Sequence, residues 1–160
     1  MMKRFGDRAK FAVEVGRLEP PDLRVVDLWA AGKLLTTDDN TAYVPSFSWS
    51  MRKSAAEVRR QEVKPCPFPG RSPEQNYQLL DADQTEFREQ YWLMHWGETV
   101  DNVSSYTYLD RDLIIVFTFW RPQHPFPEDR NKIFVARIPP HEFVSTLEAA
   151  ADLLDSRADR

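Results

Sequence analysis

Four side chains in this chain have the chemistry of nucleophiles, proton carriers or metal ligands, namely Cys66, His95, His124 and His141. No pair of histidines has metal-ligand spacing and there is no second cysteine, so the sequence argues against a zinc site. A nucleophilic pair of Cys66 with a histidine stays open, because such partners can meet in the folded chain from distant positions. Cys66 lies between two prolines, with no activating group directly beside it in the sequence, which favours a structural thiol.

Carboxylates also occur close together, which is the arrangement used in general acid–base catalysis. Each group lies in a predicted turn or helix start, where acidic residues cap helices and keep the surface soluble, so we favour that role over a catalytic one. The five glycines form no glycine-rich loop before a helix, so no phosphate-binding cradle and no cofactor are predicted. The groups are Asp38 with Asp39, Asp81 with Asp83 and Glu86, Glu98 with Asp101, and Asp110 with Asp112.

Residues 113–120 are expected to form the central strand of the fold. The segment has no charge, is rich in β-branched and aromatic residues, and is apolar on both faces with Thr118 as the only interruption. Residues 103–110 and 132–138 are expected to join it in a local antiparallel meander. The apolar stripe of a final helix that starts at Pro140 is predicted to cover one face, and helices between residues 72 and 97 the other.

The N-terminal third is predicted to be an antiparallel meander. Residues 11–15 alternate as a half-buried strand that ends at Gly16, and residues 23–30 form a second strand. Ala31-Gly32-Lys33 permits a tight reversal because glycine tolerates positive φ. Residues 42–49 are expected to form a weaker strand, which Pro45 confines to an edge.

The middle of the chain is predicted to be helical around a rigid loop. Residues 52–63 contain good helix formers, four basic side chains and few apolar ones, so a short and largely exposed helix is expected. Three prolines in residues 65–69 indicate a surface loop. Ser72 and Pro73 form a good helix start, and a second helix is expected from Asp83 to a stop at Gly97.

Length and composition indicate an α+β protein with one domain over residues 1–160. We expect a mostly antiparallel sheet of about five to six strands, covered by helices that include the amphipathic C-terminal helix. The net charge of −4 argues against nucleic-acid binding, because phosphate contacts need a basic face. The single cysteine, and the lack of a visible secretory signal or membrane-spanning segment, predict a cytoplasmic protein.

Phe5-Gly6-Asp7, followed after three residues by Phe11-Ala12-Val13, resembles the opening of a family of bacterial immunity proteins, the immunity family numbered forty-two. These proteins protect a cell from its own polymorphic toxins. Residues 28–34 are similar to the second strand and glycine turn of that family, and residues 133–138 with Glu142-Phe143 are similar to its closing strand and helix. The proline-rich residues 65–69 have no counterpart there.

The resemblance implies a non-catalytic protein that binds and neutralises a cognate toxin. Tyr91, Trp92 and Trp96 can either cover the outer face of the sheet or anchor a protein partner, since tryptophan and tyrosine are common hot-spot residues. For a cationic toxin, acidic side chains would steer association. The partner-binding residues predicted on this basis are Asp81, Asp83, Glu86, Glu89, Trp92 and Trp96.

Two other functions remain open at the level of the sequence. One is a small cytoplasmic enzyme with a dispersed active site that uses Cys66 or a histidine. The other is a structural or adaptor subunit, in which the aromatic residues form an oligomer interface. The oligomeric state does not follow from the sequence.

Overall fold

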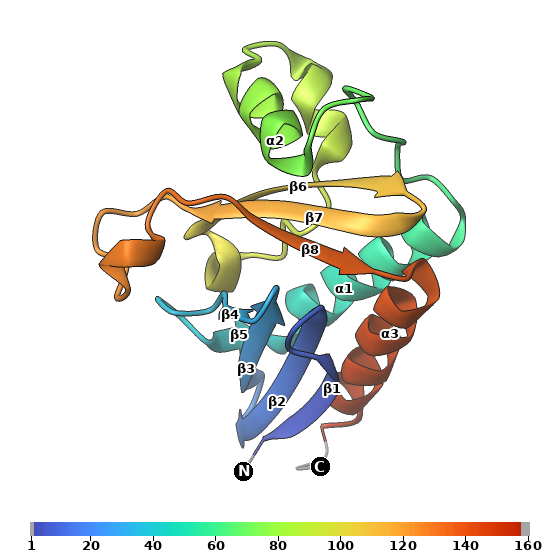
Figure 1. The fold of residues 1–160 in the computed structure, drawn as a ribbon. Coiled ribbons are helices and arrows are strands. Elements are labelled where there is room, and N and C mark those ends of the chain that lie inside the picture. Colours follow the sequence, from blue (N-terminus) through green and yellow to red (C-terminus); the bar gives the residue numbers. More distant parts are fainter. Residues whose placement is uncertain (1, 158–160) are drawn as a thin grey trace.

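Two antiparallel sheets and three α-helices organise residues 2–157, the part of the chain described by this computed structural model (Figure 1). The predicted α+β class is confirmed, but the strands form two sheets where one was expected. Sheet A has the order β1-β2-β3-β4 with β5 paired to β3, and sheet B has the order β6-β7-β8. Sheet A contains β1 (Lys3–Asp7), β2 (Phe11–Glu19), β3 (Leu23–Ala30), β4 (Lys33–Leu34) and β5 (Thr41–Tyr43), and sheet B contains β6 (Val103–Asp110), β7 (Asp112–Phe119) and β8 (Phe134–Ile138).

Sheet A is a set of hairpins whose inner face belongs to the main core. Val13 pairs with Leu28 across β2 and β3, and both side chains are fully buried. The predicted reversal at Ala31-Gly32 is confirmed, with positive φ at both residues. Gly16, predicted to end a strand, instead lies inside β2, which continues to Glu19 through an irregularity in its pairing with β3.

Helix α1 (Val44–Arg59) corrects two predictions, the edge strand over residues 42–49 and the short exposed helix over residues 52–63. Pro45 lies in the first turn of the helix, where its missing N–H forms no intrahelical bond, so it starts a helix and does not interrupt a strand. The helix packs against α3 (Pro140–Ser156). Its buried side chains are Val44, Phe47, Ser48, Met51, Ser54, Ala55 and Val58.

Strand β7 is the central strand of sheet B, as predicted, and it separates two hydrophobic clusters. Ile115 and Phe117 belong to the main core with sheet A, α1 and α3. Ile114 and Val116 belong to the second cluster on the other face. The predicted packing of the C-terminal helix is confirmed, because its stripe of Phe143, Leu147, Ala150 and Leu154 is fully buried in the main core.

Helix α2 (Pro73–Ala82) and the short helix η1 (Glu86–Tyr91) cover the second cluster, and we call them the outer layer (Figure 1). The predicted start of α2 is confirmed, with a capping box between Ser72 and Gln75. Tyr77 and Leu80 of α2 and Tyr91 of η1 pack on the sheet. None of the helices in residues 2–157 combines the length and apolarity needed to cross a membrane.

The long helix predicted from Asp83 to Gly97 is wrong. Asp83 accepts hydrogen bonds from the backbone N–H and hydroxyl of Thr85, and Thr85 in turn caps only the 3₁₀ turn η1. From Trp92 the chain forms neither helix nor strand until η2 (Glu98–Val100). The Ser54 hydroxyl of α1 donates to the carbonyl oxygen of Leu93 at 2.9 Å, which ties this irregular segment to the main core.

Candidate functional site

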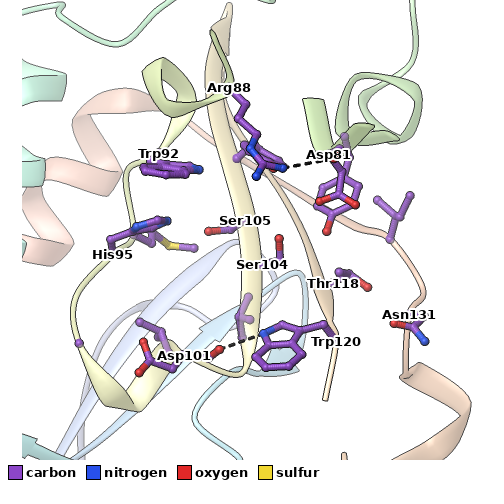
Figure 2. A pocket seen from close by; sticks show the side chains of 17 residues that line it. Asp81, Arg88, Trp92, His95, Asp101, Ser104, Ser105, Thr118, Trp120 and Asn131 are labelled. Carbon is purple, nitrogen blue, oxygen red and sulfur yellow. Dashed lines mark hydrogen bonds between the residues drawn. The ribbon is translucent and has the colours of Figure 1, made fainter. Parts of the chain in front are cut away.

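A cleft of about 730 Å³ opens where the outer layer ends and leaves part of sheet B uncovered (Figure 2). Under the outer layer, the face of the sheet carries Ile114 and Val116. Two positions further along β7 the same face carries Thr118, which pairs across the strands with Ser104, and then Trp120. The sheet surface therefore changes from apolar to hydroxyl-bearing at the point where it becomes the floor of the cleft.

Aromatic side chains stand on both sides of β6 in the cleft (Figure 2). Trp92 and His95 lie on one side with their rings stacked at 4.6 Å between centroids. Trp120 lies on the other side, and its indole N–H donates to the backbone oxygen of Asp101 at 2.9 Å. Trp92 is 39% exposed and Trp120 48% exposed, so both indoles can contact a molecule that enters the cleft.

The charged side chains lie at opposite ends of the cleft (Figure 2). At one end Arg88 donates to the backbone oxygen of Asp81 at 3.2 Å. At the other end Asp101 is exposed. In residues 2–157 neither carboxylate, Asp81 or Asp101, takes part in an ion pair.

Two ring side chains of the cleft keep an uncharged form near neutral pH. Desolvation by its neighbours lowers the pKa of His95, and the Asp101 carboxylate opposes this only in part, so the imidazole is neutral. Burial raises the pKa of Tyr77 to about 12, although a hydrogen bond with Ser104 favours the phenolate, so the phenol keeps its proton. The cleft therefore contains two carboxylates and one guanidinium as its fixed charges.

Of the six partner-binding residues predicted from the sequence, Asp81 and Trp92 line the cleft. Glu86 and Glu89 are exposed on the outer layer beside it, and Asp83 is half-buried with its carboxylate bound to Thr85. The hydrogen bonds from Thr85 hold the pKa of Asp83 below its ordinary value. These carboxylates form an acidic surface on the outer layer.

Trp96 corrects the prediction, because it is not a surface anchor. It is only 4% exposed, and its indole N–H donates to the Ser54 hydroxyl at 2.9 Å. Its ring packs edge-on against Phe11 and Phe47. In the helix expected from Asp83 to Gly97, Trp92 and Trp96 are four residues apart and would share a face, but no helix forms there and the two side chains have different surroundings.

Trp120, Arg88 and Ser105 line the cleft and were not among the predicted site residues. Part of the signal was present in the sequence. Thr118 is the only polar residue in the apolar run of residues 113–120, and its hydroxyl donates to the backbone oxygen of Lys132. The position of Trp120 just past the end of β7, and of Ser104 opposite Thr118, follows only once the strand register is known.

Cys66 lies outside this cleft. The thiol is half-buried and donates to the side-chain oxygen of Asn76 at 3.4 Å, and its hydrogen bonds include none to a histidine in residues 2–157. His124 is stacked on Phe119 at 4.2 Å. Within the same residues, no three side chains of the metal-ligating types come together as a metal site. The hydrogen bond of the thiol is thus to an amide of α2, and its structural role stays a prediction.

Comparisons of the chain with protein-family models, curated proteins and solved structures give no match. The resemblance to immunity proteins stays a prediction. The residues that carry it, Phe5-Gly6-Asp7 and Phe11-Ala12-Val13, form the β1–β2 hairpin. Gly6 has φ +89°, and a Cβ there would lie 2.3 Å from the backbone oxygen of Phe11. The hairpin therefore requires a glycine at this position of the motif.

Proposed function

We propose that this protein is a cytoplasmic immunity protein that binds a cognate bacterial toxin and blocks it without catalysing a reaction. The observation that carries the proposal is the pair of exposed indoles, Trp92 and Trp120, across one cleft. Large aromatic side chains held on a folded surface bury much area at little cost in conformational entropy, and they dominate the binding energy of many protein interfaces.

The charge distribution around the cleft favours a basic partner. The exposed carboxylates of Asp81, Glu86 and Glu89 lie on the outer layer, and Asp101 lies at the far end of the cleft. The chain as a whole has a net charge of −4. Acidic side chains around an aromatic centre accelerate association with a cationic surface and disfavour anionic partners such as nucleic acids. A toxin that acts on nucleic acid would present such a cationic surface.

The resemblance of the N-terminal hairpin supports the same function. The cleft and the resembling motif lie in different parts of the fold, because the motif forms the first hairpin of sheet A and the cleft lies over sheet B. The motif would then belong to the scaffold, and the cleft with the outer layer would supply contacts that differ from one toxin to another.

The test is co-expression in bacteria with the toxin encoded immediately upstream of this gene. Cells that produce the toxin with the intact chain should grow, and cells that produce the toxin alone should not. A matched variant that carries Trp92→Ala and Trp120→Ala should fold but lose protection, whereas Tyr43→Ala, which removes an exposed aromatic side chain outside the cleft, should keep it. Death of the cells that carry the intact chain would overturn the proposal.

A further inference from the structure

One end of the cleft has the composition of a binding site for a cation. The exposed carboxylate of Asp101 is free of ion pairs in residues 2–157. The indole N–H of Trp120 donates to the backbone oxygen of the same residue, so the two residues lie at the same end of the cleft. A carboxylate attracts a cation by its charge, and an exposed indole attracts it by the ring quadrupole.

The Trp120 ring already contacts a cation in this structure. The guanidinium carbon of Arg121 lies 5.3 Å from the ring centroid. Asp38 pairs with Arg121 at 2.8 Å, which neutralises that charge within the protein. The positive charge of Arg121 is thus compensated outside the cleft, and the carboxylate of Asp101 is not.

The other groups at this end are also suited to a polar, positively charged guest. His95 is held neutral by desolvation and does not repel a cation. Ser105 also lines the cleft, but it pairs with Phe117, so its side chain lies on the opposite face of sheet B from Thr118 and Trp120. Arg88, the only cation that lines the cleft within residues 2–157, lies at the opposite end beside Asp81 (Figure 2).

We propose that the Asp101–Trp120 end of the cleft binds an arginine side chain presented by the partner protein. The guanidinium pairs with the Asp101 carboxylate and stacks on the Trp120 indole. Arginine fits better than lysine, because a planar guanidinium can stack on an aromatic ring and donate hydrogen bonds at the same time. The identity of the partner rests on the proposed function, but the capture of arginine does not.

The probe is a short peptide, N-acetyl-Gly-Arg-Gly-amide, titrated into the full chain while the indole N–H signals are followed by NMR. The matched control is the same peptide with citrulline, which has the shape of arginine without its charge. The arginine peptide should shift the signals of Trp120 and Trp92 in a saturable way and leave that of Trp29, bound to Glu14 on sheet A, unmoved. Added salt should weaken the effect, because exposed charges are screened.

Asp101→Asn should weaken binding of the arginine peptide severalfold and leave the unfolding midpoint unchanged, since the carboxylate makes no ion pair. Equal shifts with the citrulline peptide, an unmoved Trp120 signal, or unchanged binding by Asp101→Asn would overturn the inference. A lysine peptide that binds as tightly would contradict the role given to the guanidinium. If peptide binding holds and co-expression gives no protection, only the proposed function fails. If protection holds in Asp101→Asn and the peptide does not bind, only this inference fails.

Discussion

The indole N–H of Trp96 donates to the Ser54 hydroxyl at 2.9 Å, and the same hydroxyl donates to the backbone oxygen of Leu93. The two hydrogen bonds join α1 to the irregular segment that carries Trp92. Both bonds are buried, so each donor and acceptor has lost its access to water. The position of Trp92 at the cleft therefore depends on a hydroxyl in the main core.

Ser54→Ala should destabilise the protein by about 1–3 kcal/mol, because it leaves a buried N–H and a buried carbonyl oxygen without a partner. Chemical denaturation of the variant and the intact chain measures this difference. Ser46→Ala is the matched control, since Ser46 lies on the same helix with an exposed hydroxyl. Equal stability of the two variants would show that the Ser54 hydrogen bonds contribute little.

Glu14 should make stability depend on pH in the acidic range. The residue is 3% exposed, and its carboxylate is bound by Arg8 at 2.6 Å and by Arg4 at 2.7 Å. The hydrogen bond from Arg8, opposed by desolvation, holds the pKa of Glu14 below its ordinary value. A depressed folded-state pKa adds stability above the unfolded-state pKa, which is about 4.3, and this stability is lost as pH falls through the folded-state value.

The measurement for Glu14 is the free energy of unfolding as a function of pH in the intact chain and in Glu14→Gln. We expect Glu14→Gln to cost about 2 kcal/mol at neutral pH, where a charge-assisted hydrogen-bond cluster is lost. The two curves should converge as pH falls below the unfolded-state pKa. Parallel curves across the acidic range would contradict this assignment.

Gly6→Ala should destabilise the protein more than Gly70→Ala does. Both glycines have positive φ, +89° at Gly6 and +84° at Gly70, so alanine pays a similar backbone cost at each. Only at Gly6 would the new Cβ meet backbone, the Phe11 oxygen at 2.3 Å, while the space at Gly70 is open. The difference between the melting temperatures of the two variants measures the cost of the steric clash at Gly6. Equal melting temperatures would show that the β1–β2 hairpin moves to accommodate the new Cβ.

Trp92→Ala should weaken binding of the toxin by about thirtyfold, which corresponds to the roughly 2 kcal/mol of a hot-spot residue. Tyr43→Ala, at an exposed aromatic residue that does not line the cleft, should change the dissociation constant by less than about threefold. Calorimetry with purified toxin and each folded variant measures both. A small change in the dissociation constant for Trp92→Ala would show that the toxin contacts a surface outside the cleft.

Periodicity predicted the elements whose stability comes from one buried face. The final helix, the strands around residues 113–120 and the start of α2 at Ser72 all combine a clear apolar pattern with a local start or stop signal. The same reasoning failed for residues 42–49, because Pro45 is compatible with both an edge strand and the first turn of a helix. Only the burial of Phe47 and Met51 against the main core decides between them.

The candidate site was only half predictable. Asp81 and Trp92 were among the residues expected to bind a partner, and both line the cleft. Trp96 was misplaced because a helix was expected in a segment that is irregular, where the indole N–H of Trp96 is bound by the Ser54 hydroxyl in the main core. Trp120 was absent from the predicted surface. Its place at the cleft follows from the register of β6 and β7, which sets the position of the residue after Phe119, and not from its distance to Trp92 in the sequence.

The two hydrophobic clusters on opposite faces of β7 should differ in their stability against local unfolding. The outer layer is attached through the smaller cluster, whose members include Tyr77, Leu80 and Tyr91, so it should open and exchange its amide hydrogens more readily than the main core. Its exposed residues can be replaced at small cost to the scaffold. The surface formed by the outer layer can therefore change in sequence while the main core preserves the fold.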